Sequence, residues 1–264
     1  METEGFAPAK INLTLHVTGQ RGDGYHLLDS LVVFADIGDN LSFVREERMQ
    51  ITVTGPFAQG VPTDRRNLVW QAAELAGWTG HIRLEKNLPH GAGIGGGSSD
   101  AAAVLRAFGG AARAAELGAD VPVCLATVPQ RMRGIGDLLD PISALPPLEV
   151  VLVNPRVNVP TGPVFAALET KQNPAMPADL PTFYDARMFG DWLHAQRNDL
   201  ERPARKIAPQ IEDALSALDD AMLARMSGSG ATCFGLYSEG ADKAAVRISQ
   251  AHPEWWVASG RLLS

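Results

Sequence analysis

Residues 88–100, with the sequence LPHGAGIGGGSSD, constrain the fold of this chain more than any other segment. Five glycines fall within the seven positions 91–97, and they leave the backbone free to turn its N–H groups inward. Ser98, Ser99 and Asp100 then begin a predicted helix that runs to about Phe108. Inward amides and the positive end of a helix together form a cradle for anions. The segment therefore predicts a loop that binds the phosphates of a nucleotide.

The composition is that of an ordinary soluble globular protein, with 45% hydrophobic and 20% charged residues over a length of 264. The net charge of -7 and the lack of a basic stripe argue against a nucleic-acid partner. No apolar stretch approaches the roughly 20 residues of a membrane span, and the acidic start is unlike a signal peptide. Cys124 and Cys233 lie in apolar runs, which favours buried, reduced thiols. We expect a cytoplasmic enzyme without nucleic-acid or membrane partners.

The first half of the chain is predicted to be rich in strands, at 11–17, 31–34, 41–44 and 51–53. Asn67 is a suitable N-cap for a helix from Leu68 to Gly77. A short strand at 81–85 leads into the glycine-rich loop and its helix, and a weaker helix is expected at 111–117.

Pro146-Pro147 is the best candidate for a domain boundary. The pattern after it predicts, in order, a strand at 148–153, a helix near 162–168, a proline-rich connector at 173–181 and a polar helical stretch at 186–205. A helix at 210–218, strands at 221–226 and 232–237, a helix at 242–250 and a strand at 255–258 follow. Without the insertion, this order is the β-α-β-β-α-β pattern of a ferredoxin-like sandwich.

Two familiar phosphate-binding motifs fit the loop poorly. A Walker A loop needs a lysine near its end, and none lies between Gly91 and Ser99. Gly91, Gly93 and Gly96 satisfy the dinucleotide fingerprint G-x-G-x-x-G, and Asp120 follows at nearly the expected distance. However, the preceding strand carries charged residues, whereas a central parallel strand is almost wholly apolar. A dinucleotide-binding oxidoreductase is therefore disfavoured.

Three separated segments together resemble the GHMP kinase superfamily: PAKINL at 8–13, the loop at 91–100 and SGSGATCF at 227–234. Two more, GDGYHLL at 22–28 and GADVPV at 118–123, are similar to those members that phosphorylate a cytidine-diphosphate-linked methylerythritol for isoprenoid synthesis. The resemblance spans nearly the whole chain and is weakest at about 170–196. It implies an α+β fold with an N-terminal domain (1–147) like the second domain of ribosomal protein S5 and a C-terminal ferredoxin-like domain (148–264). It also implies an ATP- and Mg²⁺-dependent kinase.

The resemblance extends to the roles of individual residues. It implies that Asp120 is the catalytic base and that Lys10 lies beside it, keeping it ionised and favouring the alkoxide that forms. From spacing alone, Asp120 is more simply an N-cap or turn aspartate, and Lys10 a solvated strand residue. Ser98 and Ser99 either lie near magnesium or cap the helix, and Asn67 either lies near the adenine or only caps its helix. No metal ligand is assigned. The residues expected to bind ATP are Asn67, Pro89, Gly91, Ala92, Gly93, Ile94, Gly95, Gly96, Gly97, Ser98 and Ser99.

The resemblance assigns the substrate's cytosine to Tyr25 and His26, where an aromatic ring stacks on the base and an imidazole bonds its edge. Asn12, on the same strand face as Lys10, is expected to bind the substrate as well. Members of the family often place a second aromatic just before a segment like Asn198-Asp199, where this chain has Gln196-Arg197. Phe183, Tyr184 and Phe189 are the alternatives for that role.

Only about 20 residues separate Asp100 from Asp120, where the family usually has a longer helical pair. We expect this trimming at Gly109-Gly110, and if it shifts Asp120, the assignment of Asp120 as base fails. One rival function is a kinase for homoserine, mevalonate or a sugar, but these acceptors carry no nucleobase for Tyr25 and His26 to bind. Another is a nucleotide-binding regulator without catalysis. We expect a small-molecule substrate and a monomer or weak homodimer.

Overall fold

The computed structural model describes residues 2–142 and 145–263. The chain forms two compact units, each assembled from separate stretches. The first contains the described residues up to Lys10, together with Gly38–His90 and Gly95–Thr127. The second contains Ile11–Ile37, Gly91–Ile94 and the described residues from Val128 on. The domain boundary expected after Pro147 stays a prediction.

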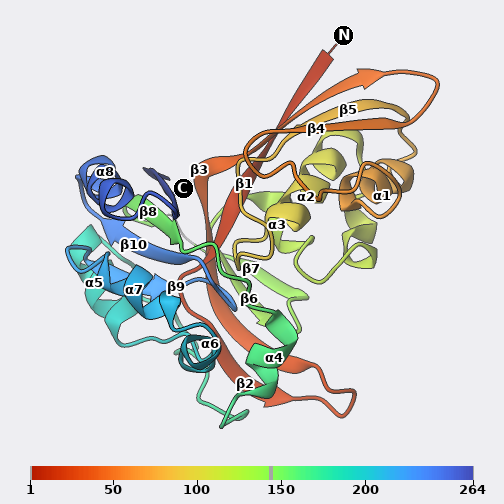
Figure 1. Ribbon diagram of the computed structural model, residues 1–264. Coiled ribbons are helices and arrows are strands. Elements are labelled where there is room, and N and C mark those ends of the chain that lie inside the picture. Colours follow the sequence, from red (N-terminus) through yellow and green to blue (C-terminus); the bar gives the residue numbers. More distant parts are fainter. Residues whose placement is uncertain (1, 143–144, 264) are drawn as a thin grey trace. The chain divides into compact units, whose positions relative to one another are not determined.

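The first unit is built on the second half of the long strand β3 (His26–Arg45), which pairs antiparallel with β5 (Gly80–Glu85). Strand β4 (Gln50–Thr54) pairs parallel with β5, and β1 (Glu2–Asn12) pairs with β3. The helices are α1 (Leu68–Leu75), α2 (Gly96–Phe108), the 3-10 helix η1 (Ala111–Glu116) and the short α3 (Val123–Ala126). Figure 1 shows α1 and α2 beside each other.

Alternation along β5 explains how its charged residues are accommodated. Ile82 and Leu84 are buried, while Arg83 and Glu85 are exposed on the other face. The strand is therefore not the fully buried parallel strand of a dinucleotide-binding fold, as its sequence indicated. Small side chains at Ala101–Ala103 let α2 pack closely on its neighbours.

The second unit contains two groups of strands. In one, β2 (His16–Gln20) and β6 (Gln130–Gly134) pair antiparallel with the first half of β3, and β7 (Leu138–Pro141) pairs with β6. The other is a four-stranded antiparallel sheet with the order β11-β8-β10-β9. Its strands are β8 (Glu149–Asn154), β9 (Leu223–Met226), β10 (Cys233–Tyr237) and β11 (Trp256–Arg261).

Helices α7 (Gln210–Ser216) and α8 (Ala241–Ala251) pack on this sheet (Figure 1). The remaining helices of the unit are α4 (Thr161–Ala166), α5 (Ala186–His194) and α6 (Glu201–Ile207). Apolar residues of β8, α7 and α8 form a continuous core with the side chains of Leu15 and Val17. The strand order confirms the predicted β-α-β-β-α-β pattern, and the fold is α+β.

Several predicted boundaries are wrong. The strands expected at 31–34 and 41–44 are parts of the single strand β3, and β6 and β7 are additional strands. The helical stretch at 186–205 is two helices, because Asn198 interrupts it and uses its side-chain oxygen to accept the N–H of Leu200 at 2.9 Å. Cys124 and Cys233 are both buried, as predicted. Among the described residues, no helix has the length and apolar character that crossing a membrane requires.

Candidate active site

The glycine-rich loop ends at Gly95, whose φ of +65 lies in the left-handed region that favours glycine. Helix α2 begins at Gly96, two residues before the predicted start, and Gly95 is its N-cap without a side-chain hydrogen bond. Ser98 and Ser99 therefore lie in the first turn, and the alternative that they cap the helix is wrong. The Oγ of Ser99 is buried and has no hydrogen-bond partner within the described part of the chain. A buried, unpaired hydroxyl at a helix N-terminus is available to a bound group.

Lys10 and Asp120 lie together in the first unit. Lys10 Nζ donates to Asp120 Oδ2 at 3.0 Å, and the lysine side chain is 5% exposed while the aspartate is 45% exposed. The ammonium is thus held on a buried stem, and the carboxylate keeps a solvent-accessible side. This arrangement suits a carboxylate that must contact a substrate.

The shortened connection still brings Asp120 to Lys10. Helix α2 ends at Phe108, and Gly109 and Gly110, with φ of +95 and +93, turn the chain into η1. A turn after η1, in which the N–H of Val121 donates to the carbonyl of Gly118 at 3.1 Å, then presents Asp120. A shift of Asp120 away from Lys10 is therefore not found, since the two side chains are 3.0 Å apart.

The first unit also contains Asn67, which caps α1. Its Oδ1 accepts the N–H of Val69 at 2.9 Å, and its Nδ2 donates to the carbonyl of Pro62 at 2.8 Å. Both ends of the side chain are therefore engaged in local structure. Its place near an adenine stays a prediction.

In the second unit, residues 91–94 of the glycine-rich loop pack against the loop at 227–232. Ser227 Oγ donates to the carbonyl of Gly93 at 2.9 Å, and the N–H of Thr232 donates to the carbonyl of Ala92 at 3.1 Å. Gly93 has φ of +75, and a Cβ there would collide with the carbonyl oxygen of Ser227. The two loops thus hold each other through hydrogen bonds and close backbone approach.

Asn12 is buried in the second unit and held by two serines. Its backbone N–H donates to Ser227 Oγ at 3.1 Å, and its Nδ2 donates to Ser30 Oγ at 2.8 Å. The amide group is therefore fixed in orientation, which is what a substrate-binding side chain requires.

Tyr25 and His26 follow the turn of the β2–β3 hairpin in the second unit. Tyr25 is 60% exposed, whereas the imidazole of His26 stacks on Phe165 of α4 with ring centroids 4.7 Å apart. The Nε2 of His26 is buried and has no partner among the described residues. Burial, and then the charge of Lys171, lower the pKa of His26, so the ring is neutral at pH 7 and offers one donor and one acceptor.

The structure separates the three aromatic residues considered for the second stacking position. Phe189 is fully buried and packs against Phe183 at 4.7 Å between centroids, while Tyr184 is 84% exposed. Phe165, which the sequence did not single out, is instead the aromatic ring beside His26. A second cluster that the sequence analysis missed joins Lys86, Asp39 and Asp100 at the start of α2.

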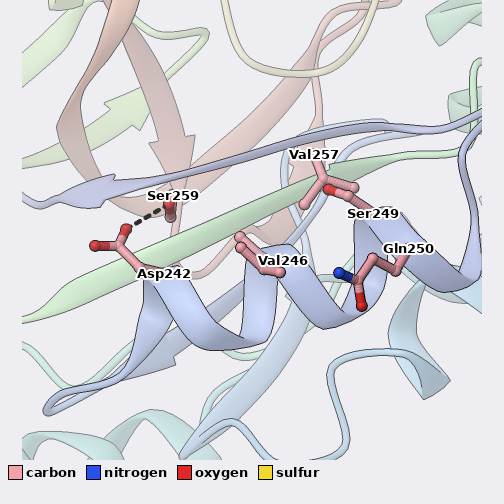
Figure 2. A pocket seen from close by; sticks show the side chains of 7 residues that line it. Asp242, Val246, Ser249, Gln250, Val257 and Ser259 are labelled. Atoms are coloured by element: carbon pink, nitrogen blue, oxygen red, sulfur yellow. Dashed lines mark hydrogen bonds between the residues drawn. The ribbon is translucent and has the colours of Figure 1, made fainter.

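A hollow elsewhere in the described part of the chain is lined mainly by uncharged side chains. A hollow of about 430 Å³ lies between α8 and β11, and Figure 2 shows Asp242 turned toward Ser259 at one end of it. Asp242 accepts a hydrogen bond from the Ser259 hydroxyl at 2.7 Å, and the other lining residues are uncharged. Within the described ranges, no group of three or more His, Cys, Asp or Glu side chains is arranged to hold a metal ion.

The sequence matches models of a known protein family and is similar to known enzymes. Residues 67–127 match the family described as GHMP kinases N terminal domain, and residues 182–254 match GHMP kinases C terminal. The chain is 59% identical over 266 residues to a 4-diphosphocytidyl-2-C-methyl-D-erythritol kinase of Dinoroseobacter shibae, covering 96% of this chain and 93% of the relative. A protein of the same name from Paracoccus denitrificans is 56% identical over 261 residues, covering 97% and 95%.

Two solved structures share the fold. A 4-(cytidine 5'-diphospho)-2C-methyl-D-erythritol kinase superposes with a TM-score of 0.77 at 33% identity, covering 99% of this chain and 100% of that chain. A homoserine kinase from Cytophaga hutchinsonii has a TM-score of 0.68 at 18% identity, covering 98% and 94%, and shows the fold alone.

Proposed function

The chain belongs to the 4-diphosphocytidyl-2-C-methyl-D-erythritol kinases of the GHMP kinase superfamily, and from this premise we propose how its residues divide the reaction. The enzyme transfers the γ-phosphoryl group of ATP to the 2-hydroxyl of the cytidine-diphosphate-linked methylerythritol, a step of the non-mevalonate isoprenoid precursor pathway. We expect direct in-line transfer, since no His or Asp of the sequence lies in a recognisable phospho-acceptor motif.

The pair of Lys10 and Asp120 is the observation that carries the proposal. A hydroxyl that attacks phosphorus must lose its proton, and the half-exposed carboxylate of Asp120 is available to accept it. The ammonium of Lys10, 3.0 Å from that carboxylate, stabilises the negative charge that develops on the acceptor oxygen. Phosphoryl transfer needs positioning and charge neutralisation more than covalent help from the protein.

The phosphates of ATP are assigned to the amides of the glycine-rich loop and to the first turn of α2. Support comes from the left-handed Gly95 and from the buried Oγ of Ser99, which is unpaired within the ranges that the structure describes. Mg²⁺, if bound beside the first turn of α2, would supply positive charge that offsets the charge of the ATP phosphates. It is usually held by substrate phosphates, waters and one or two protein oxygens, so a site with few protein ligands suits it. Ser99 is the residue whose free oxygen best fits that need.

The cytosine is assigned to Tyr25 and His26. The neutral imidazole has a buried nitrogen without a partner in the described part of the chain, as a group reserved for hydrogen bonding to a ligand has. The exposed ring of Tyr25 is available for stacking on the flat face of a base. Acceptors such as homoserine, mevalonate or a sugar lack a base, so they leave these two residues without a role.

A coupled assay of ADP release with a panel of hydroxylated acceptors tests the proposal. We expect turnover with the cytidylated polyol alone, and a loss of at least about 100-fold in kcat for Asp120→Asn, because the base is removed while the shape is kept. The KM for ATP should change little, since Asp120 is not assigned to the nucleotide.

Asp140→Asn is the matched control. Asp140 also accepts a hydrogen bond from a cationic side chain, that of Arg133 at 2.6 Å, and it is also half-exposed. This variant should retain the wild-type rate. Wild-type turnover by Asp120→Asn would remove Asp120 from its role, and turnover of homoserine, mevalonate or a sugar at a comparable rate would reassign the acceptor.

The cytoplasmic location and the monomer or weak-homodimer state stay predictions.

A further inference from the structure

Three charged side chains meet beneath the start of α2. Lys86 Nζ donates to Asp39 Oδ2 and to Asp100 Oδ2, the second at 2.7 Å, and the three side chains are 4% exposed or less. Although burial opposes it, the charges of Asp100 and then Asp39 raise the pKa of Lys86, so it remains an ammonium. We call this cluster of Asp39, Lys86 and Asp100 the loop triad.

The loop triad connects the two ends of the glycine-rich segment that belong to the first unit. Asp39 Oδ1 accepts the backbone N–H groups of Asn87 and Leu88, at 2.6 and 2.8 Å, where the chain enters that segment. Asp100 lies in the first turns of α2, where the chain leaves it. Lys86 therefore joins entry to exit across about ten residues of glycine-rich backbone.

The start of α2, which the loop triad holds, also lies close to Lys10. Lys86 Nζ lies 3.5 Å from the position of a Cβ built on Gly96, the first residue of α2. The neighbouring Gly95 lies against the stem of Lys10, because a Cβ on Gly95 would be 3.1 Å from Lys10 Cε. Gly96 and Gly95 thus lie in sequence between the ammonium of Lys86 and the stem of Lys10, which in turn donates to Asp120.

The composition of the loop triad is unusual for a purely structural cluster. Two carboxyl groups share one ammonium in an almost water-free setting, and apolar residues commonly serve stability as well or better there. Asp100 Oδ1 is also buried without a partner among the described residues, so the cluster is not even fully satisfied. Its distinguishing property is that it links two segments 14 residues apart at fixed separation.

From this geometry we infer that Lys86 is a positioning residue for ATP, which sets the separation of the two ends of the glycine-rich loop by bridging Asp39 and Asp100. The inference rests on the proposed function, since it takes ATP as the occupant of the loop. A loop released at one end samples more conformations, and its amides then bind phosphates less tightly.

Two substitutions of Asp100 provide the test. Asp100→Ala breaks the bridge but leaves the balanced pair of Lys86 and Asp39, so the protein is expected to fold. Asp100→Asn removes the same charge but keeps an oxygen for Lys86. We expect Asp100→Ala to weaken binding of a non-hydrolysable ATP analogue by at least tenfold, with the KM of the acceptor changed less than threefold. Asp100→Asn should bind the analogue within threefold of wild type. Calorimetric titration and steady-state kinetics measure these quantities.

Lys86→Met, which removes the bridge at its centre, should weaken analogue binding as much as Asp100→Ala or more. Equal binding by Asp100→Ala and wild type would overturn the inference, as would equal weakening by Asp100→Ala and Asp100→Asn, which would assign the effect to charge. A wild-type enzyme that neither binds the analogue nor releases ADP would instead refute the proposed function.

Discussion

Gly95 lies at a position where both the backbone conformation and the close approach of a neighbouring side chain favour glycine. Its φ is +65, and a Cβ would lie 3.1 Å from Lys10 Cε and 3.2 Å from Lys10 Cβ. Gly95→Ala should therefore displace the lysine stem by a few tenths of an ångström and lower kcat by about tenfold or more, since small misplacements of reacting groups are costly. Steady-state kinetics and urea unfolding measure the two effects.

Gly77→Ala is the control, because Gly77 has the same φ of +65 but nothing within 4 Å of its Cβ position. Both variants should lose about 1–2 kcal/mol of stability from the left-handed backbone. Only Gly95→Ala should lose activity. A similar fall in kcat for both would show that backbone strain alone, without the contact to Lys10, is responsible.

At this scale the sequence predicted some site residues and missed others for identifiable reasons. Spacing alone favoured a turn aspartate at 120, and only the resemblance pointed to Lys10, 110 positions away, which the structure places at 3.0 Å. No local pattern marks the loop triad, because Lys86 and Asp39 are 47 positions apart and look like ordinary strand-end charges. Phe165 was missed because α4 reads as a short apolar helix, and its ring meets His26 only through tertiary packing.

Among the elements, the proline-rich connector at 173–181 is held in place by a buried ion pair. Arg131 on β6 binds Asp29 on β3 through two hydrogen bonds of 2.8 and 2.7 Å, and it also donates to the carbonyls of residues 176–178. Arg131→Met should lower the free energy of unfolding by about 3–5 kcal/mol, since it leaves the buried Asp29 carboxylate without its partner. Urea unfolding and the rate of proteolysis within the connector measure the effect.

Arg133, two residues further along β6, provides the comparison. Its pair with Asp140 is about half exposed on both sides, and such pairs contribute at most about 1 kcal/mol. Arg133→Met should accordingly leave both stability and proteolysis nearly unchanged. If the two variants lose the same stability, burial of the Asp29 pair is not what anchors the connector.

Elements with strong local signals were predicted, and those defined by distant partners were not. The Asn67 cap and the alternation of β5 are local, and both are found as expected. The long strand β3 was predicted as two strands because its middle residues, such as Asp36 and Asp39, interrupt the apolar pattern. Strands β6 and β7 were missed because charged residues such as Arg131 occupy positions that become buried only against β3 and the connector.

For the whole molecule, one buried acid sets part of the dependence of stability on pH. Burial raises the pKa of Asp100 to about 7, with Asp39 adding to the effect and Lys86 opposing it. Between pH 4 and 7 the folded chain therefore holds a proton that the unfolded chain releases, so this group lowers stability as pH rises. In Asp100→Asn that decline is absent. The difference in free energy of unfolding, variant minus wild type, should therefore grow as pH rises from 4 and level off above pH 7.

Urea unfolding of wild type and Asp100→Asn at a series of pH values tests this prediction. Asp64→Asn is the comparison, because the pKa of Asp64 is shifted in the opposite direction. Asp64 is exposed, and hydrogen bonds from Arg66 lower its pKa to about 2. Its carboxylate adds stability above pH 4 that is lost as pH falls toward 2, so its substitution should change stability slightly and only in that lower window. Parallel curves for wild type and Asp100→Asn between pH 4 and 7 would mean that Asp100 is ionised throughout, with the ammonium of Lys86 outweighing the effect of burial.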